Sequence, residues 1–401
     1  MLEKRLSRIA YDFEAMHKPH TRVVELDILR AFAIIIIVFS HAGYFLPAIK
    51  IPYYSQLSLC GVALFLFISG FVLHLNHPDF SQRDSLTDFF KRRVLRIFPL
   101  YWLAIAVSFA TGDVVIGSPV TSQSALITIL GLQGFLSPRF GTDLMNYWSF
   151  IGIIIVLYTL YPLIAVLASD TLNLPRPFAS NLFRFAIMLI VPFTILVAAH
   201  NALFIIADAV FSFYGIFVLG VATSKYNIFH KYGFQTNDQT RLLKYIVVGG
   251  IALTFVLFVY TRELRLANVS ATLYFLNYSL FVTKNLVFFL FALVAFCLAR
   301  ILVISSCKAS RRSYQPIWYR GLLLISFSSY AIYLFFLPIL TQSMKTLTSA
   351  QLASFEVTIF QVFIGLPTVI LLAYVLQSTQ NEILNRIRKY RASTVPSSDK
   401  T

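Results

Sequence analysis

The sequence has little charge and few cysteines. Charged residues make up 12% of the 401 positions, whereas hydrophobic residues make up 58% and the mean hydropathy is +0.75. A soluble globular domain of this length carries far more charge, so that class is excluded. The three cysteines, Cys60, Cys297 and Cys307, are scattered in or beside apolar segments, so they provide neither a disulfide framework nor metal-ligand spacing. We expect no metal site and no permanently bound cofactor.

Familiar catalytic motifs of soluble enzymes are also missing. The chain contains no glycine-rich phosphate loop, no HExxH, no paired CxxC and no GxSxG. Phosphoryl transfer, zinc-dependent hydrolysis and serine hydrolysis therefore have no motif to support them.

The most prominent feature of the sequence is its long apolar segments. Ten of them are long enough to cross a bilayer. They cover residues 28–48, 57–76, 97–116, 147–168, 183–199, 203–223, 243–262, 280–304, 319–342 and 355–377. A shorter run, Ser124 to Leu136, falls below the roughly 17 residues that a span needs and is read as a re-entrant or interfacial helix. The sequence predicts an all-α polytopic membrane protein with about ten transmembrane helices.

The placement of basic residues predicts the orientation. With a cytoplasmic N-terminus, most of the 33 lysine and arginine residues fall in segments on the cytoplasmic side. Lys284 lies within a span, and the basic residues on the other side are Lys50, Arg139, Arg262, Arg265 and Lys345. This asymmetry follows the positive-inside rule and predicts that both termini are cytoplasmic. An eleventh span at the short run would invert every later loop.

The same placement bears on partners and domains. The net charge of +16 sits in short clusters between apolar runs, which is a membrane pattern and speaks against a nucleic-acid partner. We expect a cytoplasmic N-terminal segment (1–25), one membrane domain (26–378) and a basic, polar cytoplasmic tail (379–401). The sequence leaves the oligomeric state open.

The first apolar segment, LDILRAFAIIIIVFSH (Leu26 to His41), carries an arginine near one end and a histidine at the other. In a continuous helix, Arg30 and His41 share a face and lie about 16 Å apart along the axis. An ionisable group at membrane depth is a functional candidate. The alternative is an anchoring arginine and a histidine satisfied by a neighbouring helix, and spacing alone leaves both open.

A basic cluster precedes the third segment, in KRRVLRIFPLYW. Arg93 and Arg96 are an i, i+3 pair that projects together if the helix extends back, and such a pair is suited to phosphate oxygens. The alternative is a purely topogenic cluster. Ser69 and Gly70 in the second segment predict close helix approach.

Two other ionisable residues lie at membrane depth, Asp208 and Lys284. As pathway charges they would fit a transporter or flippase, although the sequence shows no internal repeat of the kind that many transporters have. Lys284 lies near the outer end of its segment, where a lysine extends to the interface.

Four motifs in order resemble the acyltransferase 3 family of integral membrane acyltransferases. The family's LDxLRxxAxxxVVxxH is similar to the segment containing Asp27, Arg30 and His41, and its GVxLFFxLSGF resembles the stretch from Gly61 to Phe71. RRxxRIxPxYW and SYxIYLxHxP complete the set. Their matches include Arg92, Arg93, Arg96, Pro99, Tyr101, Trp102, Tyr330 and Pro338.

Two departures from the family pattern concern its chemistry. Many members have an acidic residue in the stretch that begins with Trp148 here, but Ile153 and Ile154 stand near that place. The late motif often has a histidine where this chain has Phe336. His41 is therefore the one histidine with a catalytic role implied by the resemblance. A catalytically degenerate member that serves as a scaffold is an alternative.

The resemblance implies transfer of an acyl group, usually acetyl, from cytoplasmic acyl-coenzyme A to a hydroxyl of a sugar, glycolipid or surface polysaccharide across the membrane. Succinyl transfer to glucans is a variant. Arg30, Arg92, Arg93 and Arg96 would hold the donor phosphates, and His41 would act as general base or acyl carrier. Asp27, Ser69, Gly70, Tyr101, Trp148 and Tyr330 are expected to support the site. The partners are acyl-coenzyme A, the acceptor and the bilayer, with a bacterial inner membrane as the expected location.

Overall fold

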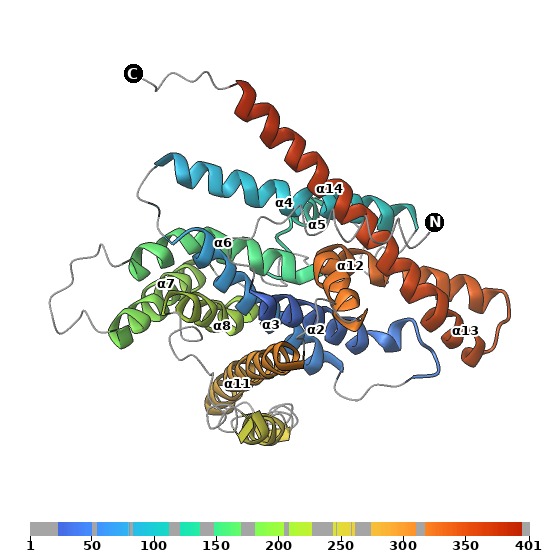
Figure 1. Ribbon diagram of the computed structural model, residues 1–401, viewed down its shortest axis with the longest axis horizontal. Coiled ribbons are helices and arrows are strands. Elements are labelled where there is room, and N and C mark those ends of the chain that lie inside the picture. The colour runs from blue at the N-terminus through green and yellow to red at the C-terminus, as the bar shows by residue number, and fades with distance from the viewer. Residues whose placement is uncertain are drawn as a thin grey trace.

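The protein folds into a bundle of helices (Figure 1). The computed structural model describes residues 23–49, 54–78, 80, 83–111, 121–136, 148–169, 181–203, 208–226, 244–245, 247–257, 259–260, 274–309 and 317–394. The helices of the first half are α2 (Val24–Ser40), η1 (Ala42–Tyr44), α3 (Tyr54–Asn76), α4 (Arg83–Ala110), α5 (Ser122–Ile129), α6 (Ser149–Ala168) and α7 (Asn181–Leu203). Those of the second half are α8 (Asp208–Lys225), α11 (Tyr274–Ala309), α12 (Ile317–Ser349), α13 (Ser354–Phe360), η5 (Gln361–Gly365, a π-helical turn) and α14 (Leu366–Thr394). The prediction of an all-α fold is confirmed.

Among the described residues, six helices are long and apolar enough to cross a membrane. They are Leu57–Asn76, Leu86–Ala110, Ser149–Ala168, Val282–Val303, Tyr319–Ser349 and Ser354–Ile387. Shorter apolar helices occupy Phe183–Ala199, Val210–Lys225 and Val247–Leu257, and α2 has 17 residues. These helices are typical of an integral membrane protein. The count of ten spans and the orientation of the termini stay predictions.

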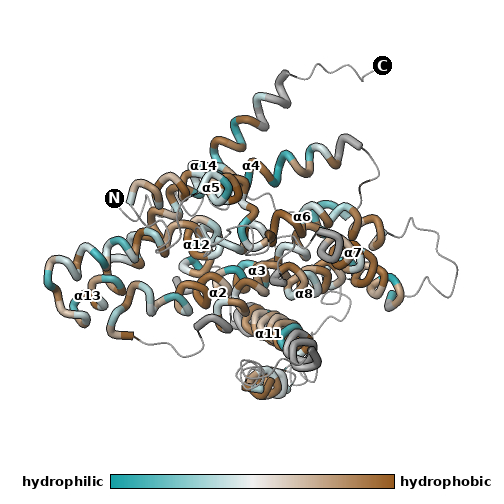
Figure 2. Tube along the Cα trace, turned by 180° about the vertical axis from the view of Figure 1, so that it is seen from behind, coloured by the Kyte–Doolittle hydropathy of each residue, from teal (hydrophilic) through white to brown (hydrophobic). Residues whose placement is uncertain are grey.

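Large hydrophobic side chains lie on the outside of the bundle. Trp102 is 50% exposed, Phe255 67% and Phe363 74%. In Figure 2 the hydrophobic colour runs along most helices, and hydrophilic turns occur where α4 and α14 project from the bundle. Such an apolar exterior is suited to lipid, because hydrocarbon chains cover it without the cost of hydrating apolar surface.

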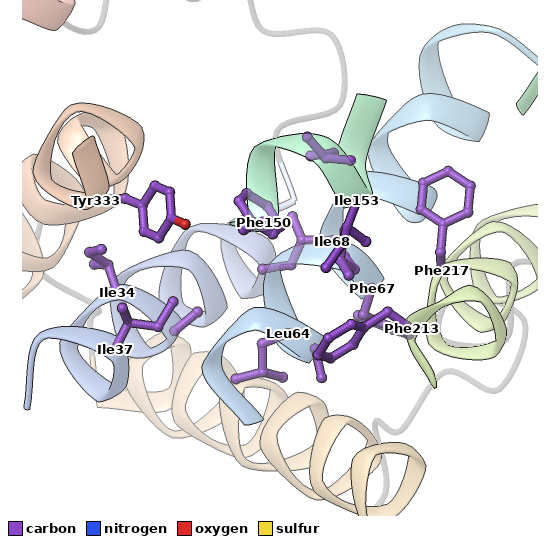
Figure 3. Packing of buried hydrophobic residues seen from close by; sticks show 14 of the residues in the cluster. Ile34, Ile37, Leu64, Phe67, Ile68, Phe150, Ile153, Phe213, Phe217 and Tyr333 are labelled. Carbon is purple, nitrogen blue, oxygen red and sulfur yellow. The ribbon is translucent and has the colours of Figure 1, made fainter. Parts of the chain in front are cut away.

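The core is centred on α3, which packs against α2 and α8. Figure 3 shows how α2, α3, α6, α8 and α12 contribute side chains such as Ile34, Leu64, Phe150, Phe213 and Tyr333. Two glycines allow the backbones of α3 and α8 to approach each other closely. A Cβ at Gly70 would lie 2.1 Å from the carbonyl oxygen of Phe217, and one at Gly220 would lie 2.1 Å from that of Phe67. The predicted close packing at Gly70 is therefore present, between α3 and α8.

Proline residues inside the helices create a second kind of contact between helices. A proline has no N–H, so the carbonyl four residues earlier loses its partner, and lipid cannot replace it. Pro99 in α4 frees the carbonyl of Leu95 in this way. The Nε2 of Gln380 in α14 donates to that oxygen at 3.1 Å and to the carbonyl of Arg96 at 3.0 Å.

Two further prolines follow the same pattern. In each case the freed carbonyl accepts a hydrogen bond from an aromatic side chain of another element. Pro338 frees the carbonyl of Leu334, to which the indole N–H of Trp148 donates at 3.2 Å. Pro192 frees the carbonyl of Met188, to which the hydroxyl of Tyr214 donates at 2.5 Å. Trp148, which precedes α6, thereby joins α6 to α12, and Tyr214 joins α8 to α7.

The short apolar run forms α5, which has eight residues and a length of about 12 Å. A capping box between Thr121 and Ser124 begins it. Tyr101 donates to the carbonyl of Thr128 at 2.5 Å, and the indole N–H of Trp102 donates to that of Ile129 at 3.0 Å. The helix is too short to span a bilayer, and these two residues of the RRxxRIxPxYW motif fasten it to α4.

Candidate active site

A cavity of about 770 Å³ lies where α2, α3, α4, α6, α12 and α14 meet. Seven of the residues singled out in the sequence border it, although they come from four different helices. They are Asp27, Arg30, Ser69, Arg92, Arg93, Arg96 and Tyr330. The structure thus gathers the predicted basic residues into one site.

The mouth of the cavity is strongly basic. Lys91, Arg92 and Arg93 share one turn of α4 and Arg96 lies on the next. Arg92 and Arg96 are exposed, and Arg93 is half-buried. Within the described part of the chain, none of the three arginines has a carboxylate within 4.0 Å. Asp88 is the acidic residue of α4 that borders the same space. Uncompensated guanidinium groups around a cavity attract a polyanion.

Arg93 is held by aromatic rings. Its guanidinium carbon lies 5.3 Å from the ring centre of Phe89 and 5.7 Å from that of Tyr158. Cation–π contact of this kind stabilises the charge without neutralising it. The Nε of Arg93 is buried and has no hydrogen-bond partner in the described residues. Arg93 is therefore positioned and still charged.

Arg30 differs, because it carries its own counter-ion. Its Nη1 lies 3.3 Å from Oδ1 of Asp27, one turn earlier on α2. Ser326 of α12 donates a hydrogen bond of 3.2 Å to the same carboxylate oxygen. A buried ion pair between Glu25 and Arg300 adds a second acidic group at this end of α2. Arg30 thus borders the cavity with its charge balanced by Asp27, and its role in holding the donor phosphates stays a prediction.

The basic segment of α4 is anchored by polar contacts. The hydroxyl of Tyr330 in α12 donates to the carbonyl of Ile97 at 2.8 Å, and Gln380 in α14 donates to the carbonyls of Leu95 and Arg96. Tyr330 therefore supports the site by holding the backbone that carries Arg93 and Arg96.

Aromatic side chains close the inner end of the cavity. Phe65, Phe150 and Tyr333 come from α3, α6 and α12, and all three border it. The ring centres of Phe65 and Phe150 are 6.0 Å apart, and those of Phe150 and Tyr333 are 5.5 Å apart. Figure 3 shows Tyr333 and Phe150 facing each other.

His41 lies beyond this aromatic layer. The helix that was expected to run through residue 48 ends at Ser40, and His41 is its C-cap. The imidazole packs edge-on against Phe336 of α12, with ring centres 5.7 Å apart. Phe336 follows Tyr333 by three residues, or about 4.5 Å of helix axis. His41 does not itself border the described cavity; the ring that it contacts, Phe336, is one helical turn beyond Tyr333, which does border it.

The hydrogen bonds of His41 fix which ring nitrogen is basic. Its Nδ1 lies 2.8 Å from the carbonyl oxygen of Ile37. A carbonyl oxygen only accepts, so Nδ1 carries the proton and the lone pair is on Nε2. Ser40 donates to the same carbonyl at 2.7 Å. A backbone carbonyl thus orients the imidazole, as a carboxylate does in many acid–base sites.

The other predicted supporting residues act through packing. Tyr101 is fully buried, donates to Thr128 and accepts from Gln133 at 2.5 Å. Its ring meets that of Trp148 edge-on at 5.6 Å. Neither borders the cavity, and Gly70 serves the contact between α3 and α8.

Several cavity residues carry no signal in the sequence. Ser326, Tyr158 and Gln377 border the cavity, yet each looks like an ordinary polar residue in an apolar helix. Only the packing of α6, α12 and α14 brings them to one place. Of the two alternative pathway charges, the Lys284 Nζ lies 5.9 Å from the Phe288 ring centre, and the side chain of Asp208 lies outside the described residues.

A comparison with protein families shows to which family the chain belongs. The family model Acyl_transf_3, described as an acyltransferase domain, matches residues 23–377. The chain belongs to the acyltransferase 3 family. The matched region contains His41 and all the arginines of the cavity mouth. Comparisons with curated proteins and with solved structures found no match. Family membership indicates an acyltransferase of the membrane and leaves donor and acceptor to be proposed.

Proposed function

We propose that the protein is a membrane O-acyltransferase. It takes an acyl group, with acetyl as the first to test, from cytoplasmic acyl-coenzyme A and passes it to a hydroxyl of a sugar, glycolipid or surface polysaccharide on the other side. Succinyl is the alternative acyl group. The proposal includes ten spans, two cytoplasmic termini and a bacterial inner membrane.

One observation carries the donor assignment. Arg92, Arg93 and Arg96 border one cavity without carboxylate partners among the described residues. Acyl-coenzyme A has its phosphates at one end and its thioester at the end of a long flexible arm. Phosphates at the arginines would direct that arm into the cavity, toward Tyr333 and the level of Phe336. A basic mouth of this kind also fits the side on which the sequence gathers its positive charge.

The chemistry assigned to His41 follows from its free nitrogen. Nε2 removes the proton from the acceptor hydroxyl while that oxygen attacks the thioester carbonyl carbon. The tetrahedral intermediate then expels the coenzyme A sulfur, which takes up the proton from the imidazolium. The products are the ester and the free thiol. In the variant, Nε2 attacks the thioester carbonyl carbon and coenzyme A leaves as the thiolate. The acceptor hydroxyl then takes the acyl group from the acyl-imidazolium, and its proton passes to the thiolate.

The aromatic layer sets a requirement on this reaction. Phe65, Phe150 and Tyr333 lie between the cavity and the level of His41. An acyl group must pass these rings to meet Nε2, so the route needs rotation of at least one of them. The layer would also keep cytoplasmic water from the thioester.

The test is substitution of His41 by alanine. Acetyl incorporation into surface glycan is measured in cells that make the protein, and coenzyme A binding is measured on the purified protein in detergent. Transfer should fall by at least roughly 100-fold because the base or nucleophile is lost, while coenzyme A binding should stay. Undiminished transfer would remove His41 from the mechanism. Wild-type protein that binds no coenzyme A would overturn the donor assignment.

A further inference from the structure

Gln377 of α14, a residue that borders the cavity, has a buried hydrogen-bond acceptor without a partner in the described residues. The residue borders the cavity and is only 8% exposed. Its Oε1 is buried and has no hydrogen-bond partner in the described part of the chain. A buried amide oxygen without a partner is unfavourable, so its presence beside a cavity needs a reason.

The hydrogen bonds of Gln380, the neighbouring glutamine, determine which polar atom of the Gln377 side chain has no hydrogen-bond partner. Gln380 contacts the carbonyl oxygens of Leu95 and Arg96, which only accept, so its Nε2 points to them. Its Oε1 then accepts from the Nε2 of Gln377 at 3.2 Å. Both N–H groups of Gln380 and one N–H group of Gln377 are used in these contacts, and the oxygen of Gln377 is the amide atom left without a partner.

The position of Gln377 indicates which part of a ligand it meets. Asn381, Leu384 and Ile387 border the cavity nearer the end of α14, so Gln377 is the innermost lining residue of this helix. Gln380 is level with the backbone of Leu95 and Arg96, and Gln377 lies one turn, about 4.5 Å, further in. The acceptor is therefore beyond the arginines, on the way to the aromatic layer.

We infer that Oε1 of Gln377 accepts a hydrogen bond from an amide N–H of the pantetheine arm of the acyl donor. This rests on the proposed function. With the phosphates at Arg92, Arg93 and Arg96, the group that passes the next turn inward is the arm, whose amide groups carry N–H donors. The adenine amino group is the other N–H donor of coenzyme A, and it lies on the far side of the phosphates. Gln377 then ties donor recognition to the backbone of the arginine helix through Gln380.

The experiment compares two fragments of the donor. Acetyl-phosphopantetheine contains the amides and no adenine, whereas adenosine 3′,5′-bisphosphate contains the adenine and no amides. Binding of each, and of coenzyme A, is measured on the full-length protein in detergent. The variants are Gln377→Leu, Gln380→Leu and, as a matched control on the exposed side of the same helix, Thr379→Val.

Loss of one hydrogen bond predicts about fivefold to tenfold weaker binding of coenzyme A and acetyl-phosphopantetheine to Gln377→Leu. Adenosine 3′,5′-bisphosphate should bind as it does to the wild type, and Thr379→Val should match the wild type with all three probes. Gln380→Leu keeps the acceptor, so it should lose less affinity for acetyl-phosphopantetheine than Gln377→Leu.

Three results would overturn the inference while leaving the proposed function intact. The first is unchanged binding of both fragments to Gln377→Leu. The second is a loss confined to adenosine 3′,5′-bisphosphate, which would assign the acceptor to the adenine. The third is an equal loss in both glutamine variants, which would show that Gln377 acts only by holding α14 against α4. Wild-type protein that binds none of the probes would overturn the proposed function as well.

Discussion

Arg30 and Arg93 line the same cavity, but their charges are balanced in different ways. The guanidinium of Arg30 lies 3.3 Å from the carboxylate of Asp27. That of Arg93 lies 5.3 Å from the ring centre of Phe89 and 5.7 Å from that of Tyr158, with no carboxylate at ion-pair distance in the described residues. A guanidinium in an ion pair attracts an anionic ligand only weakly, because the carboxylate cancels most of its charge. A guanidinium over aromatic rings keeps its charge and attracts the ligand more strongly. The comparison separates Arg30, whose charge is balanced by Asp27, from Arg93, whose charge is proposed to attract the donor phosphates.

Replacing Arg93 should have the largest effect. In Arg93→Ala, coenzyme A should bind roughly 10- to 100-fold more weakly, because a charged hydrogen-bond donor to phosphate is lost. Isothermal titration or a fluorescent coenzyme A analogue measures this. Arg386→Ala is the matched control, since Arg386 is an exposed arginine that pairs with Glu382 on α14 and does not border the described cavity. Equal affinities for Arg93→Ala and the wild type would refute the proposed binding of phosphate by Arg93.

Replacing Arg30 alone should have an intermediate effect. In Arg30→Ala the carboxylate of Asp27 stays in the cavity wall without its counter-ion, so the cavity becomes less attractive to a polyanion. We expect about threefold to tenfold weaker coenzyme A binding, and less loss at high salt. A loss as large as that of Arg93→Ala would show that Arg30 binds phosphate directly.

Removing the Arg30–Asp27 pair should have a smaller effect than removing Arg30. In Arg30→Ala/Asp27→Ala the two charges leave together, and coenzyme A affinity should stay within about twofold of the wild type. The same titration gives the result. If the double variant binds as weakly as Arg30→Ala, then the positive charge of Arg30 matters by itself.

The smallest and most local effect expected is a change in the pKa of His77 when Arg93 is replaced. His77 follows the last turn of α3, and its pKa is lowered by burial first and then by the charges of Arg93 and Arg92. In Arg93→Ala the pKa of His77 should therefore rise toward its ordinary value, although burial keeps part of the shift. Carbon-detected NMR of labelled histidine measures this. An unchanged pKa would mean that the charge of Arg93 does not reach His77.

The convergence of Arg30, Arg92, Arg93 and Arg96 was predictable, because basic residues at the ends of neighbouring spans fall at one membrane face. The catalytic role of His41 stays a prediction. The end of α2 at Ser40 was not predictable, since the apolar run continues past the helix. Contacts such as those of Tyr330 with Ile97 depend on how distant helices pack, and no periodicity encodes that packing.

The structure shows where the two departures from the family pattern lie. Phe336, which stands where members often have a histidine, packs against His41. Ile154, near the usual acidic position, borders the cavity. The chain therefore has apolar side chains at both positions, one packed against His41 and the other in the cavity wall, and the carbonyl of Ile37 orients the imidazole.

The proline contacts have a consequence for assembly. In an α4 without its neighbours, Pro99 leaves the Leu95 carbonyl without its partner inside the helix. The partner of that carbonyl is Gln380, near the end of the chain. The arginine helix thus carries an unpaired polar group until α14 has been synthesised and docked. A chain cut before α14 would therefore lack the partner of this carbonyl, on the same helix whose arginines line the cavity.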